Sequence, residues 1–422
     1  MKKIYFLSLI ALTIVFSANY AKAQSTYTKQ IIIVNGGDFG NPDDYVTVAS
    51  YDPETEETTE FVKIFTQSVQ DVIINENFAY VAAQDSIVKL NIDTFEKETA
   101  VLAKGVNQLA ISDDLLVVSF WYPANQNFVK TYSLSDLSLI SNIKEISGDA
   151  AGIIIDGGIA LVAIPGPYGS TTGKIASIDI EEGMLLSEDD YGEFYAGIGY
   201  FAKWNDVTTA FMKTPWGETN SKAATFDEEG TVIDEFDYSD ASLANSTGQQ
   251  QNNFYAEINN GIGLFDLETN ELVNPSVVEQ QDNTIAASVF DTINGLFYIT
   301  TTDFFSTGKG IIYNLDGEKT GGFDAGISAQ AIAVDYRTNT GIYKNNSMET
   351  LSVYPNPTSN FINFNIPADK EIISTIITDV SGRIVYNGKN NKQIETSSLK
   401  TGLYFVALKT NTSVFTGRFI KK

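Results

Sequence analysis

Apolar and polar residues alternate along most of the chain, in short runs separated by turn-forming residues. One recurring unit is an alternating strand, a polar turn usually led by aspartate, and a second strand, as in IVKLNIDTFEKETAVL at 87–102. Alternation on both sides of a tight turn predicts a β-hairpin. Seven copies occur at intervals of roughly 40 to 50 residues, measured between one reference residue in each turn: Asp52, Asp93, Ser135, Asp179, Asp227, Asp266 and Asp316.

A second hairpin, apolar on both strands, precedes most copies; DVIINENFAYVAA at 71–83 is the clearest. Two hairpins per period give four strands per repeat, and repeats of this length stack radially as propeller blades. The first copy lacks an innermost strand, and a spare strand, AIAVDY at 331–336, follows the seventh. The pattern predicts a seven-bladed β-propeller over 28–343, closed by pairing of that spare strand with 31–35.

Alternating strands resume at residue 351, as in FINFNI and LYFVAL, between turn residues. They predict a small antiparallel β-sandwich of the Ig-like kind over 351–422. The polar, unpatterned residues 344–350 read as a linker. The predicted fold class is therefore all-β, a seven-bladed propeller followed by a small sandwich.

The N-terminus predicts export. Lys2 and Lys3 precede an apolar run from Ile4 to Phe16, and small residues follow at Ala21 and Ala23. This pattern predicts a signal peptide over 1–23. No other stretch approaches the roughly 20 apolar residues of a membrane span, so no transmembrane segment is expected in the mature chain. The chain has no cysteine, which excludes disulfides and a lipid anchor at the signal peptide.

Several tail motifs occur in a fixed order: YPNP at 354–357, a turn at 379–382, TGLY at 401–404 and a basic end. In this combination the tail resembles the type A C-terminal sorting domain of the Bacteroidetes type IX secretion system. The resemblance implies export through the periplasm to the cell surface or the extracellular space, with the secretion machinery as partner. It assigns the sorting signal to Tyr354, Pro355, Asn356, Pro357, Gly382, Gly402, Tyr404, Lys421 and Lys422.

The repeats have no Trp-Asp dipeptide at the blade ends. Their style, AYVAA followed by IVKLNIDTFEKETAVL, resembles the YncE-like propellers of bacteria. More narrowly, it is similar to the surface propellers of Bacteroidetes that include cobalamin-binding members.

The net charge of residues 24–350, the body of the chain, differs in sign from that of residues 351–422, the tail. The chain has 27 basic and 53 acidic residues. Residues 1–23 hold three of the lysines and no acid, and 351–422 hold nine basic and four acidic residues, which leaves 15 basic and 49 acidic between them. So acidic a body repels nucleic acid, which binds through Lys and Arg. The acidity favours solubility outside the cell, with a cation-binding surface as the alternative.

Five long segments, 36–44, 121–127, 165–173, 214–221 and 302–309, join the second and third strands of their blades and are expected on one face of the disc. They carry large aromatic residues among Gly, Asn, Ser and Thr. Clustered aromatics on an exposed face suit a flat or partly apolar ligand, whereas rings that pointed outward or lay scattered would count against the idea. The alternative is local packing between loops. The predicted ligand-binding residues are Phe39, Trp121, Tyr122, Tyr168, Trp216, Phe304 and Phe305.

Catalysis has little support in the composition. The chain has no histidine, no Ser-His-Asp or Cys-His set, and no phosphate-binding glycine loop. Asp189, Asp190 and Glu193, or Asp43 and Asp44, could supply a carboxylate pair, but acidic surface loops are the simpler interpretation. The same loops could bind Ca²⁺ through oxygen ligands, although no complete calcium loop is present; no other cofactor is indicated.

Three functions remain open. The first is a secreted or surface-displayed propeller that binds a small molecule or glycan on the aromatic loop face. The second is a surface adhesion or protein-interaction propeller. The third is a carboxylate-based hydrolase or lyase. The aromatic loops favour the first over the second, and the absence of histidine weighs against the third.

Overall fold

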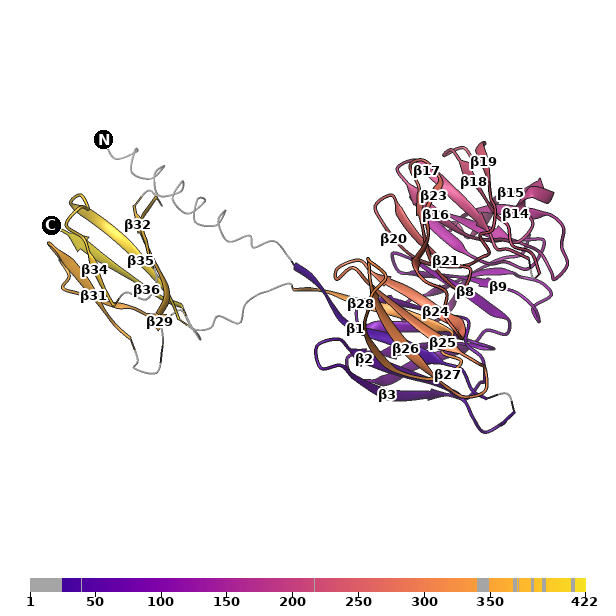
Figure 1. Cartoon of the computed structure of the whole chain (residues 1–422), viewed down its shortest axis with the longest axis horizontal. Helices are drawn as coiled ribbons and strands as arrows, with labels where there is room; N and C mark the ends of the chain where they lie inside the picture. Colours follow the sequence, from indigo (N-terminus) through magenta and orange to yellow (C-terminus); the bar gives the residue numbers. More distant parts are fainter. Residues whose placement is uncertain are drawn as a thin grey trace. The chain divides into compact units, whose positions relative to one another are not determined.

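The computed structural model describes residues 25–422 except 39, 216, 340–348, 367–369, 371, 381–382, 389–391 and 411–413. The predicted signal peptide lies outside the described residues. Two compact units form, one over Thr26–Thr338 and one over Asn339–Lys422 (Figure 1). Each is described by itself. None of the described segments forms a helix with the length and hydropathy of a membrane span.

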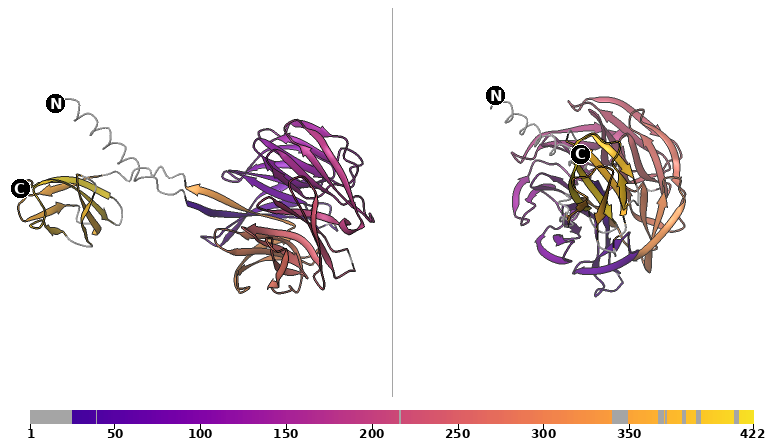
Figure 2. Two further views of the ribbon diagram at one scale, coloured as in Figure 1. Left: turned by 90° about the horizontal axis from the view of Figure 1, so that it is seen from above. Right: turned by 90° about the vertical axis from the view of Figure 1, so that its left-hand side faces the viewer.

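The larger unit holds seven four-stranded antiparallel sheets. From blade 2 to blade 7 the first strand of each sheet lies beside the first strand of the next, and the sheets follow one another around a ring (Figure 2). From blade 2 to blade 4 the strands are β4 (Asp71–Asn75), β5 (Phe78–Ala83), β6 (Ser86–Asn91), β7 (Glu96–Leu102), β8 (Val106–Ser112), β9 (Leu115–Phe120), β10 (Val129–Ser133), β11 (Leu139–Ile143), β12 (Ile153–Asp156), β13 (Ile159–Ile164), β14 (Gly173–Asp179) and β15 (Met184–Gly192).

The remaining blades repeat this plan, with a short 3₁₀ helix, η1 (Glu193–Tyr195), between blades 4 and 5. Blades 5 to 7 contain β16 (Ile198–Trp204), β17 (Val207–Met212), β18 (Ser221–Phe226), β19 (Val232–Tyr238), β20 (Leu243–Gln250), β21 (Asn253–Ile258), β22 (Gly261–Asp266), β23 (Glu271–Val278), β24 (Thr284–Asp291), β25 (Leu296–Thr302), β26 (Thr307–Asn314) and β27 (Lys319–Ile327).

Blade 1 is built from both ends of the unit. Its order is β28 (Ala331–Asn339), β1 (Ser25–Asn35), β2 (Val46–Asp52) and β3 (Glu57–Ile64), and β1 and β28 lie side by side in Figure 1. The prediction that the spare strand completes the first blade is confirmed. Closure leaves no open sheet edge between the first and last blades.

Apolar side chains fill the seven spaces between neighbouring blades. Between blades 1 and 2, for example, Val34 and Val48 pack with Val81 and Val88. Both faces of second strands such as β5 and β9 are therefore buried, whereas the outermost strands, such as β7, are largely exposed. A strand that is buried on both faces reads as a nearly continuous apolar run, which explains why the first hairpin of each repeat lacks polar alternation.

The turn after the third strand of each blade has a recurrent anchor. A side-chain oxygen at the strand end accepts the N–H of a residue further along the turn, as when Asn91 accepts from Asp93 at 3.0 Å; such Asx turns favour Asp, Asn and Ser. Three of the residues used to measure the repeat, Asp93, Ser135 and Asp316, donate the N–H, and the acceptor lies two residues earlier in each case. The seven anchors are Asp52, Asn91, Ser133, Asp179, Asp227, Asp266 and Asn314.

Lys89 on β6 ties blade 2 to the turn of blade 3. Its buried ammonium donates to the carbonyls of Leu134 and Ser135, both at 2.9 Å, and lies 4.0 Å from the centre of the Phe78 ring. We expect Lys89→Met to lower the free energy of unfolding by about 2–3 kcal/mol, because two buried carbonyls lose a charged donor. Lys97→Met, at an exposed position on β7, should change it by less than about 0.5 kcal/mol. Urea unfolding followed by tryptophan fluorescence tests this, and equal effects would contradict the assigned role.

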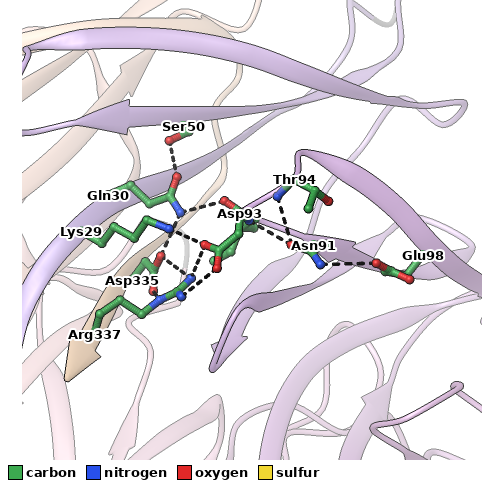
Figure 3. A network of polar contacts seen from close by, with 10 residues as sticks. Lys29, Gln30, Ser50, Asn91, Asp93, Thr94, Glu98, Asp335 and Arg337 are labelled. Carbon is green, nitrogen blue, oxygen red and sulfur yellow. Dashed lines mark hydrogen bonds and ion pairs between the residues drawn. The ribbon is translucent and has the colours of Figure 1, made fainter. Parts of the chain in front are cut away.

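A polar network fixes the closing strands to blade 2 (Figure 3). The Arg337 guanidinium on β28 donates to fully buried Asp335 (2.5 and 2.9 Å) and to Asp93 (3.2 and 2.9 Å). Lys29 on β1 also pairs with Asp93. Burial alone would raise the pKa of Asp93, but hydrogen bonds and charge from Arg337 and Lys29 lower it. Gln30 bridges the Ile92 carbonyl (3.0 Å) and Asp335 (2.8 Å).

The C-terminal unit is a two-sheet β structure. One sheet has the order β29, β36, β35, β32, β33, and the other β30, β31, β34; Ile362, Ile377 and Phe419 belong to the apolar core that they share. Residues 349–350 of the predicted linker form β29, which pairs with β36. The strands are β29 (Glu349–Thr350), β30 (Ser352–Tyr354), β31 (Phe361–Asn365), β32 (Ile372–Asp379), β33 (Ile384–Gly388), β34 (Gln393–Glu395), β35 (Gly402–Thr410) and β36 (Val414–Lys421).

Candidate ligand-binding face

The sheet order divides the propeller surface into two faces. Because the strands of each blade are antiparallel, the connections between second and third strands emerge at the same end as the connections between blades. We call this end the loop face; it carries 36–45, 121–128, 165–172, 213–220 and 303–306 together with the segments that join the blades. The Asx turns lie at the opposite end, where β1 also begins and β28 ends. The chain therefore enters and leaves the propeller away from the loop face.

Five of the seven predicted ligand-binding rings lie in the described part, and all are exposed. Tyr168 is 106% exposed and Tyr122 and Phe305 are each 81% exposed, while Trp121 and Phe304 are about half exposed. Phe39 and Trp216 lie outside the described residues. No ring contact within the described residues joins two of the five. The lining of the two described pockets includes none of the five rings, and their binding role stays a prediction.

Phe304 and Phe305 are held by an acidic turn. The Asp303 carboxylate accepts the backbone N–H of Phe305 (2.9 Å) and of Ser306 (2.8 Å) and the Ser306 hydroxyl (2.7 Å). These hydrogen bonds, the one from the Ser306 hydroxyl foremost, lower the pKa of Asp303 to about 2. Asp303 is therefore ionised over the whole physiological range and fixes the two rings at the loop tip.

A groove of about 640 Å³ lies beside this turn. Its wall combines hydroxyls, amides, carboxylates and ammonium groups, and glycines at 308, 310 and 322 keep part of it free of side chains. At Gly310 a Cβ would lie 2.1 Å from the Phe323 ring, so this position accepts only glycine without a rearrangement. The polar lining comprises Glu56, Thr58, Gln281, Asp282, Asn283, Thr301, Thr302, Asp303, Ser306, Thr307, Lys309, Lys319 and Asp324.

Ionisable residues near the axis were missed by the sequence interpretation. Lys213 follows β17, and Glu257 on β21 is 3% exposed. For Glu257 a signal existed in the sequence. Glu257 and Tyr255 are two residues apart on β21 and therefore share one face of the strand, and Tyr255 is buried. Lys213 has no comparable signal, because its surroundings come from other blades.

Asp71 opens the inner strand of blade 2 and accepts the N–H of Leu109 at 2.8 Å. Burial raises its pKa from 3.8 to about 6, against hydrogen bonds from Leu109 and Val72 that lower it. Between these two values the folded state binds the proton more tightly than the unfolded state, so stability falls as the pH rises.

We expect the free energy of unfolding of the wild type, taken relative to Asp71→Asn, to fall by roughly 2–3 kcal/mol between pH 4 and pH 7. Urea unfolding at a series of pH values measures it. Other titrating groups cancel in the difference, so a flat difference curve would refute the assignment.

The carboxylate candidates do not form an enclosed pair. Asp189 and Asp190 are exposed residues of the outer strand β15 rather than of a loop, which corrects the sequence interpretation; Glu193 begins η1. In the other candidate pair, Asp43 and Asp44, the Asp44 carboxylate accepts the N–H of Asp38 at 2.8 Å. Across the described residues, no group of three or more acids is arranged to hold a metal ion, so a calcium site finds no support in the geometry.

The predicted sorting-signal residues in the C-terminal unit have clear structural roles. Asn356 accepts the N–H of Ile420 (2.9 Å) and donates to the Arg418 carbonyl (3.2 Å), which fixes the YPNP segment to β36. Tyr404 stacks on Phe419 at 5.4 Å and donates to the Lys400 carbonyl. Gly402 begins β35 and Lys421 ends β36. Tyr354 is half exposed. The strands are flanked by Pro355, Pro357 and Lys422. Gly382 lies outside the described residues.

Comparison with protein families matches residues 352–422 to the secretion system C-terminal sorting domain. The protein thus carries a type IX sorting domain and is exported to the cell surface or the extracellular space. A search of curated proteins finds no match.

Among solved structures, a quinonprotein alcohol dehydrogenase-like protein from Bacteroides thetaiotaomicron is similar at 14% identity and a TM-score of 0.53, over 75% of this chain and 79% of that chain. A protein from Lactobacillus plantarum is similar at 10% identity and a TM-score of 0.56, over 73% of this chain and 100% of that chain. Identity this low supports the fold alone. The narrower likeness to YncE-like propellers stays an interpretation of the repeats.

Proposed function

We propose that this exported propeller binds a glycan or another polar small molecule in the groove beside Asp303, whose lining extends from the loop face to Glu56 and Lys319 near the opposite end of blades 1 and 7. The observation that carries the proposal is the groove itself, whose volume of about 640 Å³ falls in the usual range for ligand sites. Hydroxyl, amide and carboxylate groups in its wall match the hydrogen-bonding groups of a saccharide. Phe304 and Phe305 do not line the groove, but in the sequence they lie between Asp303 and Ser306, which do, and their exposed rings beside it suit the apolar face of a sugar ring.

A hydrolase or lyase fits this groove less well. Hydrogen bonds within the turn lower the pKa of Asp303 to about 2, and both of its oxygens accept those hydrogen bonds. It therefore cannot donate a proton near neutral pH. None of the carboxylates that the sequence offered for catalysis lines this groove, and we favour binding without turnover.

Surface adhesion is the second candidate. Large apolar side chains are exposed on outer strands, among them Leu102, Leu139 and Ile140. A protein partner could cover them, and this alternative predicts attachment to cells or matrix that free saccharides do not inhibit.

A glycan array probed with the purified protein and with Asn283→Trp tests the proposal. Asn283 lies on an exposed connection that lines the groove, so a tryptophan there should block the groove without altering the core. We expect saccharide signals that Asn283→Trp abolishes and that Tyr168→Ala, remote from the groove lining, retains. Thermal shift with cobalamin, haem and Ca²⁺ tests the other ligand classes. Absence of any saccharide signal, or signals that Asn283→Trp leaves intact, would exclude the groove as the site.

A further inference from the structure

The two sheets of the C-terminal unit differ in the side chains that they turn away from their shared core. An antiparallel sheet with one buried face usually carries polar residues on its other face. The three-stranded sheet of β30, β31 and β34 largely follows this rule. Its outward positions include Ser352, Asn363, Asn365, Gln393 and Glu395, and the Gln393 amide donates to Asn363 at 3.0 Å.

The outward side of the five-stranded sheet is apolar at its centre instead. On β35, alternate residues are buried in the core, and the residues between them, Leu403, Phe405 and Ala407, point outward. Residues paired across an antiparallel ladder point to the same side, and Leu403 pairs with Ile420 while Ala407 pairs with Ile376. We call this surface the outer apolar face; it comprises Ile376, Ile384, Leu403, Phe405, Ala407 and Ile420.

The outer apolar face is open to solvent. Phe405, Ile420 and Ile384 are 36%, 48% and 55% exposed. Single exposed apolar residues are common on protein surfaces. Neighbouring ones on a regular sheet form a patch, and such patches mark interaction surfaces.

The charged groups on this side of the sheet are basic. Arg418 pairs with Phe405 across the ladder, Lys409 follows on the same side of β35, and both are exposed. Within β32, β33, β35 and β36, the described residues on this side include no acid, because Asp379 pairs with the core residue Tyr404 and so lies on the opposite side. A partner that covers the face is thus expected to carry carboxylates near the border of the contact.

Several residues of the sorting motifs are used inside the domain. Tyr404 and Lys421 are only 6% and 7% exposed, and the Asn356 side chain is bound to the backbone of β36 through both its oxygen and its nitrogen. These residues therefore hold the fold in place. Recognition by a partner also needs exposed groups, and the outer apolar face with its neighbouring arginine supplies the kinds that protein interfaces favour.

We propose that the outer apolar face is the surface by which this sorting domain docks on a protein of the secretion machinery, and that the docking site on that protein is apolar with a carboxylate border. The occupant follows from the family of the unit, because a sorting domain has to be recognised by the system that exports it. Desolvation of the apolar centre supplies affinity, and Arg418 and Lys409 supply orientation. The inference does not depend on the groove beside Asp303, which belongs to the other compact unit.

Polar substitution on the face tests the proposal in cells that produce the full chain. In Phe405→Thr/Ile420→Thr, the amount of surface-displayed and released protein should fall about tenfold or more, because two apolar side chains of the contact are lost, and the protein should accumulate in the periplasm. Threonine keeps strand propensity, and melting temperatures of the purified proteins check the fold.

Phe361→Thr is the matched control. Phe361 is 44% exposed on the outward side of the other sheet, so this variant should be exported like the wild type. Wild-type export of Phe405→Thr/Ile420→Thr, or an equal loss in Phe361→Thr, would overturn the proposal.

Charge reversal tests the same face without altering its apolar residues. Arg418→Glu should reduce surface display, and Arg418→Lys should preserve most of it. Lys392→Glu, at an exposed position beside β34, changes the net charge of the tail by the same amount and should leave display unchanged. Equal display of Arg418→Glu and Arg418→Lys would contradict the carboxylate border and with it the proposal.

Photo-crosslinking identifies the occupant of the face. With Phe405 replaced by benzoylphenylalanine, irradiation of the producing cells should give an adduct that mass spectrometry identifies as a component of the type IX machinery. The same replacement of Phe361 should give no such adduct. At position 405, an adduct with a second copy of this chain or with its own propeller, or no adduct, would assign the face to another role and overturn the proposal.

Discussion

Deletion of residues 352–422 should abolish appearance of the protein at the cell surface and in the medium, and leave it folded in the periplasm. The matched family is a sorting domain, so its removal takes away the export signal. The propeller closes on its own strand β28, which ends at Asn339, and contains its seven apolar cores without the tail. Folding should therefore survive the deletion.

Cell fractionation with immunoblotting measures this outcome, and the melting temperature of the retained protein checks its fold. Another type IX cargo in the same cells controls for the machinery. Continued surface display of the truncated protein would contradict the assigned route. Asn356→Ala tests the same route with a single substitution, and we expect it to reduce surface display. It removes the two hydrogen bonds that fix the YPNP segment to β36 and leaves the propeller unchanged.

Replacement of Arg337 by alanine should lower the free energy of unfolding by about 3–5 kcal/mol, because removal of one partner leaves a buried charge uncompensated. That charge is Asp335, which is 0% exposed and bound to Arg337 through both oxygens. Asp93 loses the same partner. Burial alone would lower the pKa of Arg337, but hydrogen bonds and charge from Asp335 and Asp93 raise it. The lost contacts are those of β28, the strand that closes the ring of blades.

Lys203→Ala is the matched control. Its ion pair with Asp156 also lies at the end of the propeller opposite the loop face, but the Asp156 side chain is 68% exposed. We therefore expect the free energy of unfolding to fall by less than about 1 kcal/mol. The double variant Asp335→Asn/Arg337→Met should recover much of the stability, because no buried charge remains. Urea and thermal unfolding of the four proteins provide the test. Equal losses for Arg337→Ala and Lys203→Ala would show that the network does not hold the ring closed.

Local patterns predicted the blades because each blade is made of neighbouring segments. Alternation and turn residues suffice for hairpins, and counting the repeats placed 331–336 beside 31–35. The residue that accepts the hydrogen bond in each turn could not be predicted, since Asn91 and Asp93 are both common turn residues and only the hydrogen bond between them shows which one accepts.

The sites were less predictable because they join distant residues. The contact between Arg337 and Asp93 spans 244 residues, and the hydrogen bonds that link Lys213 through Asn245 and Glu257 to Ser288 join three blades. No spacing in one sequence encodes these contacts. The groove depends equally on glycines whose missing side chains have no periodic pattern. The aromatic residues were visible in the sequence, but the use of Asp303 to position two of them was not.

The central claim is that the groove beside Asp303 binds a saccharide, and calorimetric titration with the strongest glycan from the array tests it most directly. The account predicts that Phe304→Ala/Phe305→Ala weakens binding about tenfold or more, since each aromatic contact contributes about 0.5–1.5 kcal/mol. Tyr168→Ala should bind like the wild type. Unchanged affinity in the double variant, or an equal loss in Tyr168→Ala, would contradict the claim.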